Sequence, residues 1–272
     1  INGNVNAFYI HNDSKDANTI DGGLANARGA NGKSTSAINT GLLPSWLGVT
    51  GRTRQNDLDV AFLISLQPGS SETGALSSGT QNNRQAYLTF GDKSWGSIKI
   101  GKDLGIFASD AILSDMTLLG VGAPTAAGGN TTLGRIGAGY IYADWKPQIA
   151  YTTPNMNGFQ ATVGISKHFT DNSVLGGSAV STTTMSGSTT NASPTYEGKA
   201  SYSFAANDVT GKIWVSGIAQ KAAQLTNGSV NDDSVAYAGD IGASINAAGF
   251  GLVGYYYAGN GIGTTGQGYD GY

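Results

Sequence analysis

The chain of 272 residues contains no cysteine, six prolines and two histidines, and only 12% of its residues are charged. Without cysteine, disulfides, thiol chemistry and cysteine-based metal sites are excluded. No stretch approaches the roughly 18 apolar residues of a membrane-spanning helix. The charged fraction is about half that of a typical soluble domain, and the net charge of −3 argues against a general nucleic-acid binder.

Glycine and small polar residues take the place of the missing charge. The chain has 42 glycines, and its hydrophobic fraction of 39% leaves no surplus for a large oily core. Serine, threonine, asparagine and tyrosine suit strands that have one apolar and one polar face. If such a chain lies in a membrane, it must do so as a closed barrel, because only helices and barrels satisfy every backbone group in lipid.

The connections between strand-like segments alternate between tight and long. We expect tight turns at Arg52–Asp57, Gly91–Trp95, Pro154–Gly158, Ala205–Asp208 and Asn246–Gly249. We expect long connections at Asn12–Pro44, Pro68–Asn83, Asp103–Ala138, Phe169–Pro194 and Lys221–Asp233. In an up-and-down sheet, alternate connections lie at opposite ends. Short connections at one end and long connections at the other are typical of an outer-membrane barrel, which has short periplasmic turns and long outer loops.

Period-2 alternation predicts half-buried strands. It is clearest in Asp57–Gln67, where Leu63 is the one misfit and the apolar face comprises Leu58, Val60, Phe62, Ile64 and Leu66. The same alternation occurs in Trp95–Lys102, Phe159–Ser166, Tyr196–Phe204 and Ser234–Ile245. In these strands Lys99, Glu197, Lys199 and Asp240 fall on the polar face.

Aromatic residues gather near the expected strand ends, at Tyr151, Phe159, Tyr196, Phe204, Phe250 and Tyr255–Tyr257. This placement fits the aromatic girdles at the two membrane interfaces. The alternative is ordinary β-propensity, because tyrosine and phenylalanine are enriched in any strand.

The count reaches about eleven strands by Tyr272, an odd number that leaves two free edges. Unpaired edges cannot survive in lipid. We therefore expect residues 1–272 to be a single β-barrel domain that lacks its C-terminal strands, the N-terminal portion of a longer chain.

Three stretches together resemble the general porins of the Gram-negative outer membrane. Residues Arg84–Asp115 resemble a strand that carries a lumen-facing arginine, a short glycine-containing turn, a strand ending in a glycine–basic pair and then a long loop. Tyr151 with Pro154–Phe159 resembles the porin turn Tyr-x-x-Pro-x-x-x-Gly-Phe, and Trp46–Gly51 resembles the second porin strand. The order and spacing of these stretches carry the resemblance, which extends over most of the chain at the level of strand order.

The resemblance implies a transmembrane antiparallel β-barrel, with 16 strands in the full chain, that assembles as a homotrimer around a water-filled lumen. The barrel would contact outer-membrane lipid and lipopolysaccharide, and small hydrophilic solutes and ions would diffuse through it. The loop at Asp103–Ala138 (residues 103–138) would fold into the lumen and constrict it. Its apolar residues need a surface to pack on, and a short helix is expected at Ser109–Leu113.

Porins of this kind set acidic groups on the loop against basic groups on the wall. Carried over by position, the constriction residues are Arg84, Lys99, Lys102, Asp103, Asp110, Asp115 and Arg135, with Asp115 the best match for the loop carboxylate. Trp46 stands where an arginine is common, and Leu118 and Leu119 replace a second loop acid. These departures predict a weaker transverse field.

No enzyme, cofactor or resident metal is expected. His11 and His168 show no reason to pair, and the acidic pairs Asp57 with Asp59 and Asp232 with Asp233 could at most bind Ca²⁺ weakly, because they lack the spaced ligand set of a Ca²⁺ loop. Two other functions stay open: a substrate-selective outer-membrane channel, and a surface structural or adhesive β-protein.

Overall fold

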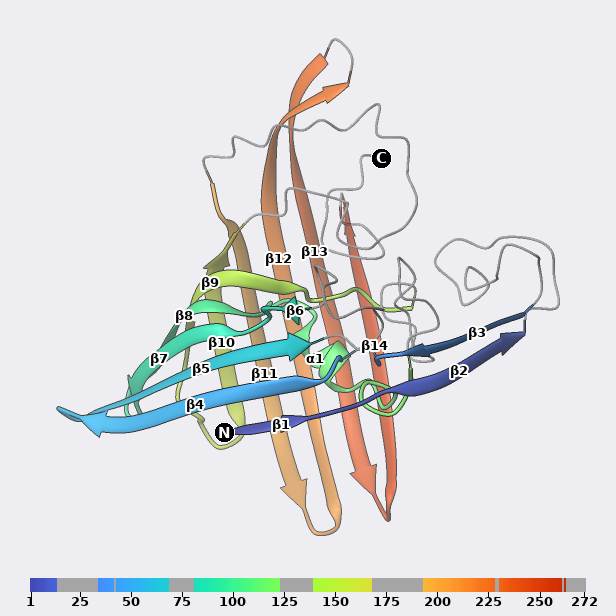
Figure 1. Cartoon of the computed structure of the whole chain (residues 1–272). Coiled ribbons are helices and arrows are strands. Elements are labelled where there is room, and N and C mark those ends of the chain that lie inside the picture. The colour runs from blue at the N-terminus through green and yellow to red at the C-terminus, as the bar shows by residue number, and fades with distance from the viewer. Residues whose placement is uncertain are drawn as a thin grey trace.

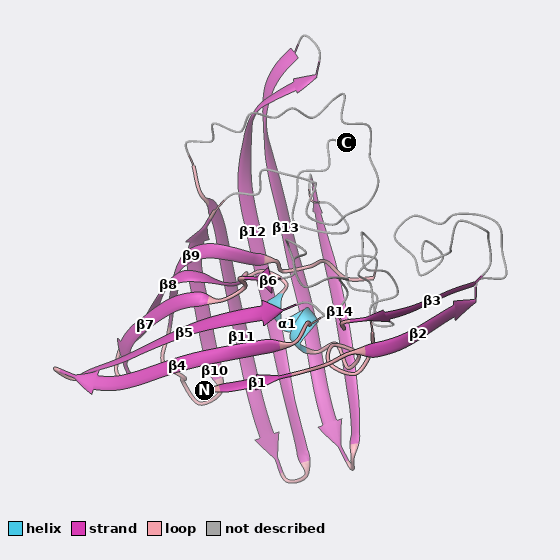
Figure 2. Cartoon of the chain, viewed as in Figure 1, coloured by secondary structure: helices cyan, strands magenta, loops and turns pink. Residues whose placement is uncertain are grey.

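The computed structural model describes residues 1–13, 34–41, 43–68, 81–122, 139–167, 193–227, 230–260 and 262. In the described part of the chain nearly all regular structure is β-strand, with one short helix, α1 (Ser109–Leu113) (Figure 2). Among these residues, no helix is long and apolar enough to cross a membrane.

Eleven strands form one continuous antiparallel sheet in the order β1-β4-β5-β7-β8-β9-β10-β11-β12-β13-β14 (Figure 1). Their bounds are β1 Asn2–Asn4, β4 Trp46–Gln55, β5 Leu58–Pro68, β7 Ala86–Asp92, β8 Gly96–Leu104, β9 Trp145–Thr152, β10 Phe159–Ser166, β11 Thr195–Ala206, β12 Val209–Asn227, β13 Val230–Ala247 and β14 Phe250–Asn260. A short β6 (Gln81–Asn82) pairs with β5. Strands β2 (Phe8–Asp13) and β3 (Ser34–Asn39) form a separate hairpin. The all-antiparallel sheet confirms the expected fold class.

The five expected tight turns are confirmed at one end of the sheet. In the β4–β5 turn, Asn56 and Asp57 have φ of 49° and 62°. Two successive positive φ angles match the primed turns whose twist suits paired strands. The β13–β14 turn has the same feature at Ala248 and Gly249, with φ of 50° and 81°.

Three expected long connections contain strands instead. The connection Pro68–Asn83 holds β6. The connection Asn12–Pro44 holds β3. The connection Lys221–Asp233 is wrong as a loop, because β12 continues to Asn227 and β13 starts at Val230, with a register shift between Ala222 and Leu225. A polar stretch looks like a loop when read alone, but two such stretches can satisfy their backbone groups by pairing with each other, whatever their side chains.

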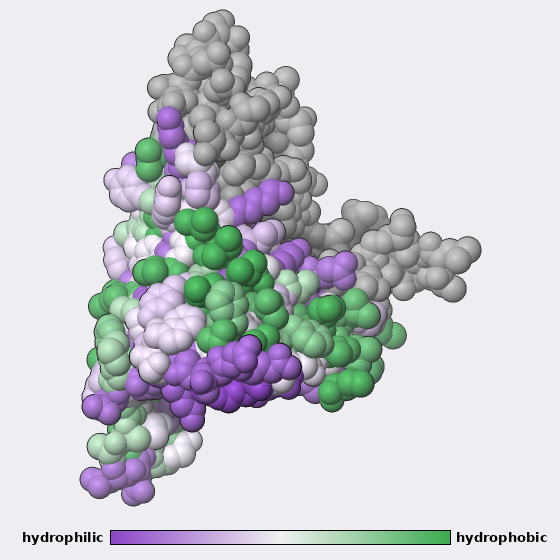
Figure 3. All heavy atoms as spheres, turned by 90° about the vertical axis from the view of Figure 1, so that its left-hand side faces the viewer, coloured by the Kyte–Doolittle hydropathy of each residue, from purple (hydrophilic) through white to green (hydrophobic). Residues whose placement is uncertain are grey.

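One face of the sheet, here called the apolar face, is apolar and open. Neighbouring strands place Phe62, Leu88, Ile100, Ile149, Ile165, Tyr196 and, past Ala219, Tyr237 in one cross-strand row. Their exposed fractions lie between 38% and 57%. Bulky apolar side chains left exposed in a continuous row mark a surface made for a nonaqueous neighbour. In Figure 3, hydrophobic residues spread across the middle of the molecule and hydrophilic ones gather towards its lower part.

The opposite side, here called the polar face, carries the charged side chains. One row runs Arg52, Ala61, Thr89, Lys99, Ala150, Gly164, Glu197, Ile218 and Ala238. The next includes Thr162, Lys199, Ser216 and Asp240. The expected period-2 faces are therefore confirmed. The sheet curls, and α1 lies against this polar face (Figure 1).

The strands have lengths suited to crossing a bilayer. Strands β4, β5, β8, β9, β10, β11 and β14 contain 8 to 12 residues, against the roughly 9–11 that a tilted transmembrane strand needs. In the described residues, β1 pairs only with β4 and β14 only with β13, so they form the two edges of the sheet. The expectation of further strands stays a prediction.

Candidate functional site

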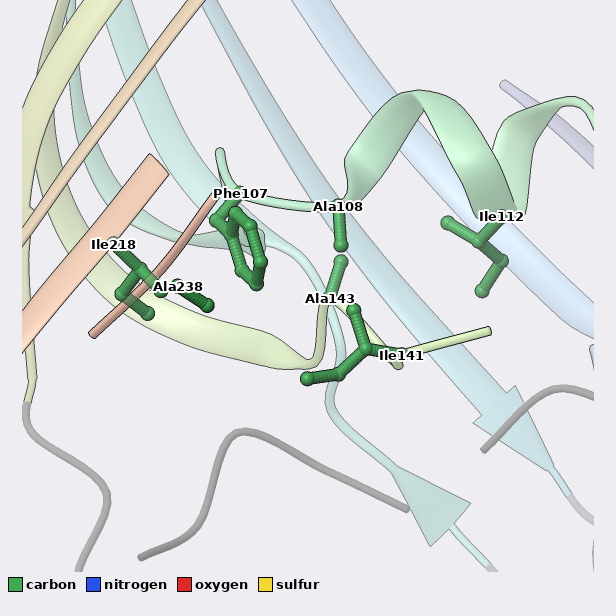
Figure 4. Packing of buried hydrophobic residues seen from close by; sticks show 7 residues of the cluster. All are labelled: Phe107, Ala108, Ile112, Ile141, Ala143, Ile218 and Ala238. Carbon is green, nitrogen blue, oxygen red and sulfur yellow. The ribbon is translucent and has the colours of Figure 1, made fainter. Parts of the chain in front are cut away.

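The connection after β8 packs back onto the polar face through an apolar cluster. Phe107 is fully buried, and Ile112 is 3% exposed. Phe107 packs with Ile218 of β12 and Ala238 of β13, while Ala108, Ile141 and Ala143 extend the cluster along the connection (Figure 4). The expected helix at Ser109–Leu113 is confirmed, as is the burial of Ile106, Phe107 and Ile112.

The end of α1 and the residues after it differ from the expectation that the apolar residues of this connection pack on a surface. Leu113, Met116 and Leu119 are 65%, 91% and 65% exposed, so they do not pack on the described wall. Leu118 packs partly against the cluster. Four of the five residues of α1, Ser109 to Ile112, are buried, and Leu113 is the exposed last residue of the helix.

Glu197, on β11, holds the start of the β8–β9 connection against the polar face. One carboxylate oxygen accepts the backbone N–H groups of Ile106 and Phe107, each at 2.9 Å. The other accepts the Ser166 hydroxyl at 2.5 Å and lies 2.7 Å from Lys146 Nζ. The Glu197 side chain has no exposure and that of Lys146 only 6%. A buried charge needs a partner and full hydrogen bonding, and this carboxylate has both.

Asp110 fastens α1 to two neighbouring strands. Its carboxylate lies 2.9 Å from Nζ of Lys199 on β11 and also pairs with Lys212 on β12. Lys199 donates to Ser109 Oγ as well, at 2.8 Å. Burial alone would raise the pKa of Asp110, but the two ammonium groups outweigh burial and hold that pKa below its usual range.

A third fastening runs from the backbone of Ala108 across two strands. Ala108 N–H donates to Ser216 Oγ at 3.2 Å, and the Ser216 hydroxyl donates to Asp240 at 2.6 Å. Tyr255 OH donates to the other oxygen of Asp240 at 3.0 Å. Together these contacts hold residues 106–110 on β11 and β12, and Asp240 of β13 holds Ser216 in place.

Asp103 and Lys99 form an ion pair on the wall, four residues apart on β8. Gln85 donates to Asp103 at 3.0 Å, and the Asp103 side chain is only 10% exposed. Lys99 lies 4.8 Å from the ring centroid of Tyr87 and stays 32% exposed. In the same row of the polar face, Arg52 is exposed.

Asp115 is held within its own connection rather than by wall lysines. It accepts the Thr117 backbone N–H at 2.9 Å, the Thr117 hydroxyl at 2.8 Å and Tyr140 OH at 2.6 Å. Burial and the hydrogen bond to Asp115 raise the pKa of Tyr140. The carboxylate that faces wall bases is thus that of Asp110, the second candidate from the sequence.

The remaining predicted residues lie apart from this group. Arg84 stacks its guanidinium over Trp145, 5.8 Å from the ring centroid. Lys102 shares its strand face with Ile100 and is paired in register with Ala86 and Pro147, which places it on the apolar face. Arg135 lies outside the described residues.

The sequence interpretation left out Lys146, Glu197, Lys199, Lys212 and Asp240 as site residues. Strand parity already placed Glu197, Lys199 and Asp240 on the polar face, so the signal was present for those three. Among the described residues, no three histidine, aspartate or glutamate side chains gather as a metal site would require. His11, far from this group in the sequence, hydrogen-bonds Ser36 at 2.9 Å; His168 lies outside the described residues.

An antiparallel sheet of membrane-crossing strands, apolar on one face and charged on the other, defines an outer-membrane β-barrel protein. A family model described as Gram-negative porin matches residues 1–272, and the chain belongs to that family. Membership of that family places the chain in the outer membrane of Gram-negative bacteria.

Two solved structures share this fold at low sequence identity. Salmonella typhi OmpF in complex with daunomycin matches with a TM-score of 0.55 and 15% identity, covering 94% of this chain and 64% of that chain. The outer membrane channel DcaP of Acinetobacter baumannii matches with a TM-score of 0.54 and 16% identity, covering 94% and 61%. The chain thus spans less than two thirds of the length of either. No curated protein matches the sequence.

Proposed function

We propose that this chain forms a homotrimeric, water-filled channel through which small hydrophilic solutes and ions diffuse down their gradients. The proposal includes no cofactor and no chemical step. Residues 103–138 narrow the channel from within, as in the general porins that the sequence resembles.

The fastening of α1 to the polar face is the observation that carries this proposal. Asp110 meets Lys199 and Lys212, and Glu197 accepts two backbone N–H groups of the same connection. A polar wall that holds a folded segment leaves a narrowed, wet passage beside it. In the family, fixed charges at such a constriction orient dipolar solutes and filter ions by sign.

The charges that would line this passage differ in how free they are. Arg52 is exposed and Lys99, although paired with Asp103, stays 32% exposed, whereas Asp110 is ion-paired with two lysines. We propose Arg52 and Lys99 as wall bases, Asp110 and Asp115 as the acids of the loop, and Asp103 as the wall acid paired with Lys99. Arg84 and Arg135 would lie near the root and end of the loop. Asp103 and Asp110 are ion-paired and Asp115 is hydrogen-bonded within its own connection. These pairings support the weaker transverse field expected from Leu118 and Leu119.

Single-channel recording in a planar bilayer tests the proposal. Purified protein should give large, ohmic steps that close in three levels, because each protomer of a trimer conducts separately. Silence from a sample that migrates as a folded, heat-modifiable trimer would argue against an open diffusion channel and for a selective one. A folded protein that neither forms trimers nor inserts would instead support the adhesive alternative.

A further inference from the structure

Residues 113–122 of the β8–β9 connection, here called the crossing segment, expose only apolar residues. The exposed positions are Leu113, Met116, Leu119 and Gly120, and the three side chains are 65%, 91% and 65% exposed. A β-carbon placed on Gly120 would have no heavy atom within 4 Å, so open space lies beside the backbone there as well. Apolar side chains that gather on an exposed surface mark a site of interaction.

The acids nearest to these side chains are engaged elsewhere. Asp115 accepts the backbone N–H and the hydroxyl of Thr117 and also the hydroxyl of Tyr140. Asp110, three residues before the crossing segment, is ion-paired with two lysines of the wall. No exposed residue of the crossing segment is charged. The surface that this segment offers to a passing molecule is therefore apolar.

The two ends of the crossing segment are held by different parts of the protein. At its start, Asp110 holds α1 on β11 and β12. At its end, Gly122 is buried and forms a bridge with Gly41, which follows β3. Phe8 and Ile10 of β2 fill the space of a side chain at residue 122, because their atoms would lie 2.6–2.8 Å from its β-carbon. Glycine permits this close approach.

These two anchors belong to parts of the sheet that are not neighbours. Strands β2 and β3 lie in the connection between β1 and β4, at one edge of the sheet, whereas β11 and β12 lie beyond β10. The crossing segment joins them on the side of the polar face, where α1 lies. Its exposed side chains pack on neither part. They border the open space between the two, which in the proposed channel is the passage.

We propose that Leu113, Met116 and Leu119 line the passage and favour solutes that carry an apolar ring or chain beside their polar groups, such as aromatic amino acids. The inference rests on the diffusion channel proposed above and names its preferred class of solute. A polar side chain loses hydration beside an apolar lining and gains no partner there. An apolar ring instead gains van der Waals contact and leaves water. Hydrophobic constrictions are one of the devices that control permeation through pores.

Swelling of liposomes that contain the purified protein tests the proposal. Phenylalanine and glutamine are the probes, because both are zwitterions at neutral pH and differ in having an apolar ring or a polar amide. We expect phenylalanine to enter at least as fast as the smaller glutamine. The ratio of the two rates should fall at least threefold in the triple variant Leu113→Ser/Met116→Ser/Leu119→Ser.

The matched control is Ile149→Ser. It also replaces a half-exposed apolar side chain by serine, but on the apolar face of β9, away from the passage. The ratio of the two rates should be the same in Ile149→Ser as in the unmodified protein. A fall in this control as large as that in the triple variant would overturn the assignment to the crossing segment.

Two results from the triple variant would also overturn the proposal. One is an unchanged ratio of the two rates. The other is an equal rise in both rates together with a lower melting temperature, because the three side chains would then act by packing on the wall. If the unmodified protein admits neither probe and no arabinose, the diffusion channel itself fails and this inference fails with it. Swelling by arabinose therefore separates failure of the channel from failure of the solute preference.

Discussion

At the scale of single residues, the buried pair of Lys146 and Glu197 explains how the start of the β8–β9 connection is held against the polar face. The carboxylate satisfies two backbone donors of the connection and one hydroxyl while it neutralises Lys146. Removing one member of such a pair leaves the other charge buried and uncompensated. This costs far more free energy of unfolding than removing both members.

Glu197→Gln should therefore loosen residues 105–122, because it removes the carboxylate that offsets the buried charge of Lys146, at a cost of about 3–5 kcal/mol. We expect noisier single-channel current and faster proteolytic cleavage within this stretch. Adding Lys146→Met to Glu197→Gln should recover much of the lost stability, since the buried positive charge is then removed as well. A double variant as loose as the single one would contradict the role of the ion pair.

The pH response of α1 follows from Asp110. Because its pKa in the folded protein is lowered, the contacts to Lys199 and Lys212 are fully present above the ordinary aspartate pKa of about 3.9 and are lost as the pH falls through the lowered value. Single-channel conductance should therefore be constant from pH 7 to about 4 and change only below that range.

The variant Asp110→Asn isolates this response. At neutral pH it should already show the altered conductance that the unmodified protein reaches in acid, and it should change little more on acidification. The same acid transition in both proteins would assign the response to another carboxylate.

At the scale of elements, strand parity assigns adjacent residues to opposite environments. Phe62 on β5 is 41% exposed on the apolar face, whereas its neighbour Ala61 lies on the polar face opposite Arg52. A carboxylate placed at Phe62 meets lipid, but one placed at Ala61 meets an arginine.

Phe62→Glu should destabilise the folded protein, by less than the roughly 2–4 kcal/mol that a lysine or arginine costs at the midplane of the lipid face. Ala61→Glu should change stability little, because it gains a cross-strand partner. Urea unfolding monitored by tryptophan fluorescence compares the two. Equal losses of stability would mean that both faces of β5 meet the same medium.

Much of this element layout could be predicted from the sequence, because local patterns determine it. The five tight turns, the faces of β5, β10 and β11 and the helix Ser109–Leu113 depend on neighbours within a few residues. The extension of β12 and β13 depends on pairing across the hairpin, which no single segment reveals. The choice of Asp110, on α1, over Asp115, two residues beyond α1, depends on where the connection folds back onto Lys199 and Lys212, a tertiary property.

At the scale of the whole molecule, the two ends of the sheet should face different compartments. The chain contains no cysteine, so a single introduced thiol reports its own location. Lys167 directly follows β10 at the end with the long connections, and Lys93 lies in the β7–β8 turn at the other end. In intact cells, a membrane-impermeant maleimide should label Lys167→Cys but not Lys93→Cys.

Permeabilising the outer membrane should then make Lys93→Cys reactive while leaving the labelling of Lys167→Cys unchanged. The reverse pattern would invert the orientation assigned from loop lengths. Labelling of the unmodified protein gives the background, which should be zero.

The uneven lengths of the connections also imply an order of assembly. Strands β11 to β14 are joined through positions 207–208, 228–229 and 248–249, so all their pairings are local and can form on the microsecond scale of hairpins, about 1–10 μs. The β8–β9 pairing must instead close over residues 105–144, and the entropy of loop closure rises with length. We therefore expect the β11–β14 meander to pair first. The earlier strands would then pair onto it, and the segment that carries α1 would pack last.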